Sequence, residues 1–318
     1  MNKDKKTILL ITYDNWGFNQ YIADALEAKG HDVTHINFHH FRYKYPNIGY
    51  KTLNFFTKNT GILNLKHVHY NNIILQELEK IKKIDTSIYI KADFLSQNTI
   101  EAINKKSEKS VLIISDSINR YPKTKNILHL FDKVFSFEKK DCKNYNLIFK
   151  TNFIYNYVEN ISENFKYKVF SISSLDNRLP VFQKIAKYLH ELKVNYKIII
   201  FTSKKKDDPY LEFSKYTLSI AENNAFLEES EIMLDVHRTK QQGLSFRVFE
   251  SLGLQKKLIT TNSDIANYDF YNADNIHIIE DVENINIPDS FFENPYRKIP
   301  KEVLNKYLIE NWVDELIV

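Results

Sequence analysis

Short apolar runs alternate with amphipathic stretches along most of the chain. The run from Thr7 to Tyr13 predicts a buried β-strand, and the stretch from Gly17 to Gly30 has apolar residues at four-residue steps, which predicts a helix that Gly30 ends. A second apolar run, from Asp32 to Phe38, predicts another strand. Strand, helix and strand within so short a segment are typical of the βαβ unit of a parallel sheet.

The same alternation continues through the first half of the chain. It predicts strands at Ser87–Lys91, Val111–Asp116, Lys133–Phe137 and Leu147–Lys150, and a helix at Asn71–Lys83. The segment from His39 to His69 has no clean period and is crowded with Tyr, Phe, His and Lys. We interpret it as an irregular insertion, the kind of segment that often meets a substrate on such a scaffold.

The pattern restarts after Thr151 to Lys166, which we interpret as a domain boundary. Beyond it the runs predict strands at Tyr167–Ser173, Tyr196–Thr202, Ile232–Val236, Lys257–Thr261 and Ile276–Ile279, and helices at Leu179–Lys193, Thr217–Glu229 and Val303–Ile317. The predicted fold class is α/β, with two Rossmann-like doubly wound domains at 1–155 and 156–302. The final helix, within 303–318, carries Trp312 and is free to pack back on the N-terminal domain.

Composition and charge narrow the function classes. The 318 residues are 43% hydrophobic and 14% aromatic, which is ample for two packed cores. A net charge of +4 from 44 basic and 40 acidic residues permits an anionic small molecule or peripheral contact with an acidic membrane. Acidic residues are interspersed through most of the chain, so we predict no nucleic-acid partner, although the Lys- and aromatic-rich segment above leaves that alternative open.

The cysteine count and the apolar runs bear on location. Cys142 is the only cysteine, so an intramolecular disulfide or a thiolate zinc site is excluded and a reducing, cytoplasmic location fits. The N-terminal apolar run, Ile8 to Ile11, is too short for a signal peptide or a membrane span, which needs roughly 20 apolar residues. We expect a cytoplasmic protein, peripheral at most at the inner membrane face.

The candidate chemistry centres on Gln241 to Asn262, QQGLSFRVFESLGLQKKLITTN, which holds two of the six glycines. In an open parallel sheet, ligands lie beyond the carboxyl ends of the strands. The preceding strand ends at Val236, so the loop from His237 to Gly243 is predicted to lie at that edge, where Gly243 lets the backbone approach a ligand. A helix that begins near Leu244 points its free N–H groups at the ligand and favours a phosphate or diphosphate.

Two charged residues follow on one face of that helix. Arg247 and Glu250 are three residues apart, and a carboxylate at this depth can accept hydrogen bonds from the hydroxyls of a ribose. The alternative is an ordinary surface salt bridge worth less than about 1 kcal/mol. For Gly253 we favour a helix C-cap ahead of the next strand.

The segment GLSFRVFESLGLQKKLITTN resembles the donor-site segment of GT-B glycosyltransferases, in which a glycine-bearing loop and a helix with a glutamate precede an apolar strand. It is most similar to family-1-like donor domains of bacterial surface-polysaccharide synthesis and to the CgeB-like branch, which share an RVFE-type helix. The resemblance implies two Rossmann-like domains facing a cleft, with 1–155 on the acceptor side and 156–302 holding the nucleotide-sugar donor.

The resemblance also implies roles for single residues. Glu250 would bind the ribose of the donor, and the backbone amides of Gly243, Leu244 and Ser245 would bind its diphosphate. Many of these enzymes carry a second glutamate eight positions earlier, where this chain has Gln242. Gln242 keeps a hydrogen-bonding group and loses a charge, which leaves the identity of the sugar open.

Further candidates stand at the ends of predicted strands. The loop before the helix at 179 carries Arg178, which the resemblance places near the donor phosphates; the alternative is that Asp176 and Asn177 cap the helix and Arg178 is solvated. His237 can hydrogen-bond a sugar hydroxyl or phosphate, and Arg238 can hold a phosphate bidentately, although either can equally be structural.

For catalysis we predict Asp14, in the loop after the first strand, as the general base of an inverting reaction; His39 and His40 compete for that role. The chain has no Asp-x-Asp motif of the kind that holds a metal against a diphosphate. We therefore predict no metal and no cofactor, with the nucleotide-sugar as a substrate and the leaving group stabilised by helix N-termini and arginines.

The resemblance implies a metal-independent glycosyltransferase whose acceptor is a cell-surface glycan (capsule, exopolysaccharide or lipopolysaccharide), free or lipid-linked. Two alternatives stay open. A non-catalytic nucleotide-sugar-binding protein would explain Gln242 as the mark of a degenerate donor site. A GT-B-like nucleotide-sugar epimerase would need an acid and a base on either side of the sugar ring.

Overall fold

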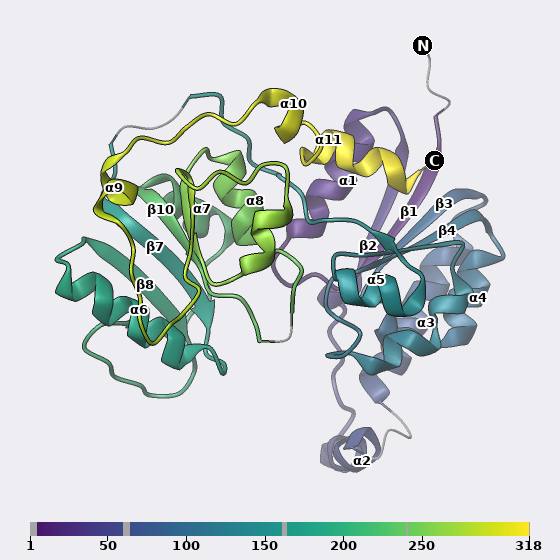
Figure 1. Ribbon diagram of the computed structural model, residues 1–318. Coiled ribbons are helices and arrows are strands. Elements are labelled where there is room, and N and C mark those ends of the chain that lie inside the picture. The colour runs from purple at the N-terminus through teal and green to yellow at the C-terminus, as the bar shows by residue number, and fades with distance from the viewer. Residues whose placement is uncertain (1–4, 60–63, 161–163, 240, 318) are drawn as a thin grey trace. The chain divides into compact units, whose positions relative to one another are not determined.

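The computed structural model describes residues 5–59, 64–160, 164–239 and 241–317. The chain divides into two compact units, of which unit 1 is Met1–Lys150 with Val313–Val318 and unit 2 is Thr151–Trp312 (Figure 1). Each unit is built on one six-stranded sheet in which all the paired strands are parallel. The predicted pair of doubly wound sheets is therefore present.

Unit 1 has the strand order β2-β1-β3-β4-β5-β6. Its strands are β1 (Thr7–Thr12), β2 (Asp32–Asn37), β3 (Ile84–Ile90), β4 (Ser107–Ile114), β5 (Lys133–Ser136) and β6 (Ile148–Phe149). Its helices are α1 (Phe18–Ala28), α2 (Ile48–Asn59), α3 (Leu65–Glu79), α4 (Gln97–Asn104) and α5 (Lys139–Tyr145), with 3-10 turns η1 (Phe38–His40), η2 (Ala92–Phe94), η3 (Pro122–Asn126), η4 (Leu128–Leu130) and η6 (Val313–Leu316).

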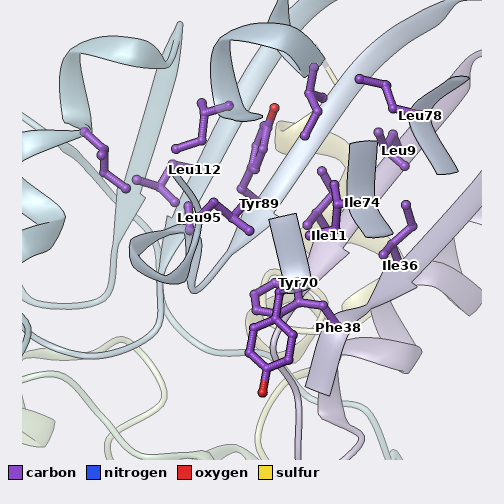
Figure 2. Packing of buried hydrophobic residues seen from close by; sticks show 14 of the residues in the cluster. Leu9, Ile11, Ile36, Phe38, Tyr70, Ile74, Leu78, Tyr89, Leu95 and Leu112 are labelled. Carbon is purple, nitrogen blue, oxygen red and sulfur yellow. The ribbon is translucent and has the colours of Figure 1, made fainter. Parts of the chain in front are cut away.

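The centre of the unit 1 sheet is buried on both faces, which is why β1 is a continuous apolar run instead of an alternating one. Every residue of β1 from Ile8 to Thr12 is buried. On one face, Leu9 and Ile11 lie in the same buried cluster as Ile74 of α3 (Figure 2). Ile100 of α4 belongs to that cluster as well.

Unit 2 has the strand order β12-β11-β10-β7-β8-β9, the order found in dinucleotide-binding folds. Its strands are β7 (Tyr167–Ser174), β8 (Tyr196–Phe201), β9 (Glu212–Ser214), β10 (Ser230–Asp235), β11 (Lys257–Thr260) and β12 (Ile276–Ile278). Its helices are α6 (Leu179–Glu191), α7 (Ile220–Glu228), α8 (Phe246–Gly253), α9 (Asp289–Glu293), α10 (Lys301–Leu304) and α11 (Ile309–Trp312), with the 3-10 turn η5 (Ser263–Asn267).

Alternate residues of the unit 2 strands enter two separate cores. Val169 packs with α6 on one face, whereas its neighbour Phe170 packs with α7 and α8 on the other. The period of two along each strand therefore assigns one set of side chains to each helical layer.

Two predictions of local structure are wrong. The segment from His39 to His69 is not irregular, because it contains η1, α2 and the start of α3, which begins before the predicted Asn71; its residues 60–63 lie outside the described part of the chain. The predicted helix from Val303 to Ile317 is broken into α10, α11 and η6.

The break has a tertiary cause. Around Leu308 the chain pairs with Ile154 as a parallel bridge, in which Ile154 donates to the carbonyl of Tyr307 at 2.7 Å and accepts from Ile309 at 3.0 Å. Those bonds replace helical ones at this point. The last residues then pack on unit 1, where Asp314 lies 2.9 Å from Nζ of Lys29.

Candidate functional site

The strand order of unit 2 reverses between β7 and β10, and this is the place where ligands bind in open α/β sheets. β7 leads into Asp176 and Arg178, and β10 leads into His237 and Arg238. The fold thus brings together, at one edge, candidates that are about sixty residues apart in the chain.

Arg178 ties the ends of the two strands together. It donates from Nε to Asp176 at 2.9 Å, from Nη2 to Oγ of Ser173 at 2.7 Å and from Nη1 to the carbonyl of Val236 at 2.8 Å. Its side chain is 15% exposed, so the alternative of a solvated Arg178 is wrong. Asp176 also accepts from the backbone N–H of Arg178, as the capping interpretation expected.

Arg238 approaches the same carboxylate and is more accessible. Its Nη1 lies 3.4 Å from Oδ2 of Asp176, and its side chain is 36% exposed. Burial alone would raise the pKa of Asp176, but hydrogen bonds from Arg178 and the charges of Arg178 and Arg238 outweigh it and lower that pKa. Two arginines sharing one carboxylate leave the cluster with a net positive charge, which suits an anionic ligand.

His237 is held by Thr261 of the neighbouring strand end. Its Nδ1 lies 2.8 Å from Oγ1 of Thr261, and its backbone N–H donates to the same oxygen at 3.0 Å. Burial lowers the pKa of His237; the charge of Asp235 raises it in part, and that of Arg178 lowers it further. These effects favour the neutral imidazole, and its Nε2 is left to act as a hydrogen-bonding group for a ligand.

The loop that leads into α8 is pinned at several points. The carbonyl of Gln242 accepts from Asn262 at 3.0 Å, and the carbonyl of Leu244 accepts from Asn152 at 2.9 Å. Ser245 is the N-cap residue of α8, yet its Oγ donates to Asp235 at 2.8 Å and does not cap the helix. Lys240, in the same loop, lies outside the described residues.

Backbone donors remain at this helix terminus. None of the described residues accepts a hydrogen bond from the backbone N–H of Leu244 or Ser245. The neighbouring Gly243 is buried and is not among the residues with positive φ. Two adjacent amides at a helix N-terminus are suited to an anion.

Glu250 is the most enclosed of the charged candidates, because its side chain is 3% exposed. Its Oε1 accepts from the hydroxyl of Tyr155 at 2.6 Å and from Asn223 at 3.4 Å, and its Oε2 lies 3.2 Å from Nη1 of Arg247. The surface-salt-bridge interpretation is wrong, since the pair with Arg247 is buried. The ribose role stays a prediction.

Two buried polar atoms beside Glu250 have no hydrogen-bond partner among the described residues. They are Oδ1 of Asn223, an acceptor, and Nη1 of Arg247, a donor that meets Glu250 only as an ion pair. Orphaned buried groups are rare and mark places where a water or ligand completes the network. One acceptor and one donor next to a carboxylate match what vicinal hydroxyls can satisfy.

Gly253 is not the C-cap that the sequence favoured. It is the last residue of α8, and a Cβ there would lie 2.6 Å from Cγ2 of Ile154 and 2.8 Å from the carbonyl oxygen of Asn156. The residue with positive φ after this helix is Gln255. Gly253 therefore serves the close approach of segment 154–156, the segment that also carries Tyr155 to Glu250.

In unit 1, Asp14 is engaged by the backbone. Its Oδ1 accepts from the N–H groups of Trp16 at 2.9 Å and Gly17 at 2.8 Å, and its Oδ2 accepts from Asn19 at 2.6 Å. Asp14 thus orders the start of α1, and its role as general base stays a prediction. The competing His39 and His40 lie exposed in η1.

Unit 1 also contains a cavity of about 820 Å³ beside the carboxyl ends of β1 and β3. Within it the ring of Tyr13 stacks on that of Phe94 at 4.6 Å, and His67 lies 5.0 Å from Phe94. The described residues that line it are Tyr13, Lys58, Asn64, Lys66, His67, Val68, Tyr70, Asn71, Asn72, Leu75, Phe94, Leu95, Ser96, Asn98, Thr99 and Lys123, none of them acidic.

The cavity was not identified from the sequence, although the aromatic-rich segment that supplies part of its wall was singled out. Burial lowers the pKa of His67, and the charges of Lys123 and Lys58 lower it further. The cavity therefore combines aromatic faces with positive charge, a surface suited to an anionic molecule that contains a ring.

No group of three or more His, Cys, Asp or Glu side chains in the described part of the chain could hold a metal ion. None of the helices there combines the length and the apolar character needed to cross a bilayer.

In sequence, the chain matches no protein-family model and no curated protein. In structure, it is similar to an α,α-trehalose-phosphate synthase (UDP-forming) from Burkholderia xenovorans in complex with glucose-6-phosphate, with a TM-score of 0.56, 11% identity and coverage of 98% of this chain and 99% of that one. The N-terminal domain of trehalose-6-phosphate phosphatase from Candida albicans gives a TM-score of 0.54 at 11% identity, covering 100% of this chain and 97% of that one. At such identity the likeness concerns the fold, and the predicted GT-B class with two Rossmann-like domains is confirmed.

Proposed function

We propose that this protein is a glycosyltransferase that moves a sugar from a nucleotide-activated donor to a cell-surface glycan. The observation that carries the proposal is the cluster at the switch point of unit 2. There Arg178 and Arg238 share Asp176, beside the open amides that precede α8. The fold shared with the trehalose-phosphate synthase supports the same class of reaction.

In this proposal unit 2 binds the donor. The amides of Leu244 and Ser245, together with Gly243 and the N-terminus of α8, bind the diphosphate, and Arg238 neutralises it as it leaves. Arg178 is a positioning residue, because its donors are spent on Asp176 and on the two strand ends. His237 contributes a neutral hydrogen-bonding group.

The ribose would lie beside Glu250, where Asn223 offers an acceptor and Arg247 a donor that have no hydrogen-bond partner among the described residues. For Glu250 to contact it directly, the hydroxyl of Tyr155 has to release Oε1. Gln242 stands where the resemblance expects the contact to the donor sugar. No metal or cofactor takes part in this scheme.

On the acceptor side, the cavity of unit 1 offers aromatic faces for sugar rings and lysines for acidic groups. Asp14 remains our candidate for the general base. The membership of the CgeB-like, surface-polysaccharide branch and the glycan acceptor rest on the resemblance of the α8 segment.

The test is nucleotide binding to the full-length chain. UDP, GDP, CDP, CMP, dTDP and ADP are titrated by calorimetry with and without EDTA, on the wild type and on Arg238→Gln. Loss of one charge-assisted contact in a half-exposed site should weaken binding about tenfold or more. Arg297→Gln, which removes an exposed arginine paired with Asp274, is the matched control.

The expected result is one nucleotide that binds in EDTA, binds Arg297→Gln equally and binds Arg238→Gln more weakly. Binding of no nucleotide to the folded chain would overturn the proposal. Binding of a nucleotide-sugar that is neither hydrolysed nor transferred to any glycan would instead favour the non-catalytic binding protein.

A further inference from the structure

Helix α2 of unit 1 exposes the side chains that a globular protein ordinarily buries. Ile48 is 82% exposed, and Phe55 and Phe56 are each 62% exposed. Leu53 and Tyr50 are also among the exposed large hydrophobic residues. Figure 1 shows that α2 stands away from the sheet of unit 1. Large apolar side chains gathered on one exposed element mark an interaction surface.

The inward face of the same helix is polar. At 100° per residue, Ile48, Leu53, Phe55 and Phe56 fall within an arc of about 160°, and Asn54 lies opposite its centre. Asn54 is buried, donates to the hydroxyl of Tyr45 at 2.8 Å and accepts from the backbone N–H of Leu65 at 2.7 Å. The helix is therefore anchored through a polar residue while its apolar arc faces outward, the reverse of a core-packed helix.

The charge around the helix has a single sign. From Val33 to Gln76 the chain has five Lys or Arg residues and no Asp or Glu: Arg42, Lys44, Lys51, Lys58 and Lys66. The remainder has 39 basic and 40 acidic residues (44 − 5 and 40 − 0), so this segment supplies the whole positive excess of the chain. In α2, Lys51 and Lys58 fall beside one edge of the apolar arc.

We propose that α2 is an interfacial helix that docks this protein on an anionic lipid bilayer. Ile48, Leu53 and Phe55 enter the boundary between headgroups and acyl chains, and Lys51 and Lys58 reach the anionic headgroups. The surrounding acid-free segment adds attraction to the negative surface.

The observations favour a bilayer over the other possible occupants. A second copy docked through α2 would bring Lys51 and Lys58 of both copies to one interface, and like charges oppose that contact. Lys58 also lines the cavity of unit 1, so the docking face and the cavity are continuous at that residue. Membrane docking does not depend on donor binding, so the failure of either proposal leaves the other standing.

The test is co-sedimentation of the full-length chain with vesicles of phosphatidylcholine alone or of phosphatidylcholine with phosphatidylglycerol. We expect binding to the anionic vesicles that weakens as salt is raised. Leu53→Ser with Phe55→Ser should abolish it, and Lys51→Gln with Lys58→Gln should weaken it about thirtyfold. Tyr216→Ser, at a residue of unit 2 that is 82% exposed, is the matched control and should bind as the wild type does.

All four positions to be changed are exposed, so the melting temperatures of the variants should match that of the wild type. No binding of the wild type to anionic vesicles, or equal binding by Leu53→Ser with Phe55→Ser, would overturn the proposal. A drop in molecular mass in that variant, without vesicle binding by the wild type, would assign the face to a second copy and also overturn it.

Discussion

Both units have a parallel sheet, but the side chains at the carboxyl edges of the two sheets differ. At the β7/β10 edge of unit 2, charged side chains are held by partners within the protein: Arg178 donates to Asp176, and Glu250 accepts from the hydroxyl of Tyr155 and pairs with Arg247. At the β1/β3 edge of unit 1, lysines and aromatic rings line an open cavity of about 820 Å³. Both edges are positively charged, but Asp176 and Glu250 at the first are in ion pairs with arginines, whereas Lys58, Lys66 and Lys123 at the second form no ion pair among the described residues.

The two edges therefore suit different kinds of ligand. A site held by mutual hydrogen bonds keeps its geometry before the ligand arrives, which suits a chemically constant group such as a diphosphate. A cavity lined by lysines and rings suits ligands of varied shape, such as the glycan acceptor that we propose. Changes at the unit 2 edge should therefore affect stability, and changes in the unit 1 cavity should affect the ligand and leave stability intact.

The largest effect should come from Glu250→Ala. It leaves Arg247 as a buried cation and removes the acceptor of the Tyr155 hydroxyl. Breaking a buried pair from one side costs about 3–5 kcal/mol of unfolding free energy. Urea unfolding measures it, and Glu283→Ala, at an exposed ion pair with Lys184, should cost no more than about 1 kcal/mol. Equal losses of unfolding free energy in the two variants would mean that the contacts of Glu250 stabilise the fold no more than an exposed ion pair does.

Gly253→Ala should come next. The new methyl group would clash with Ile154 and with the carbonyl of Asn156, and a backbone atom cannot yield as a side-chain end does. Overpacking of this kind costs about 1–3 kcal/mol. The control is Gly49→Ala in the first turn of the exposed helix α2, where the near neighbour is only the side-chain oxygen of Asn47 and the stability should change by less than about 1 kcal/mol. Denaturant unfolding measures both variants. An unfolding free energy unchanged by Gly253→Ala would contradict the close approach of segment 154–156 to Gly253.

These two residues also show how far the sequence could go. The apolar periods predicted both sheets and placed Arg178, His237 and Arg238 at one edge, because strand ends of a parallel sheet follow from the order of strands and helices. They could not show that Tyr155 donates a hydrogen bond to Glu250, or that Ile154 leaves no room for a side chain at Gly253. Both partners come from a segment without an apolar period. Contacts between distant segments depend on packing that no local pattern records.

The His39–His69 segment was misjudged for a related reason. Its helix α2 carries apolar residues on the outward face and a polar anchor, Asn54, on the inward face, so the usual association of apolar positions with the core fails there. The sequence did not predict the cavity of unit 1, because its walls combine that segment with Phe94 and Lys123, which lie far along the chain.

A smaller effect should appear with pH at the unit 2 edge. Burial lowers the pKa of His237 below its unfolded value near 6.5, so the unfolded chain binds the proton more readily. The stability linked to His237 is complete above that value and is lost as the pH falls through it and on toward the folded pKa. Urea unfolding at about pH 8 and about pH 5 should show a smaller loss in His237→Asn than in the wild type; an identical loss would show that His237 is not the group responsible.

The smallest effect should be in unit 1, where Lys123→Gln should raise the pKa of His67 and leave stability unchanged. The charge of Lys123 is one cause of the lowered pKa, and removing an exposed cation from a cavity wall breaks no described ion pair. Titration of the imidazole resonance by NMR gives the pKa directly, and urea unfolding gives the stability. Lys125→Gln, at an exposed position of η3 outside the cavity lining, should shift the pKa less. If Lys123→Gln instead destabilises the fold as changes around Glu250 do, the cavity is a structural element like the unit 2 edge and the contrast between the two sheets fails.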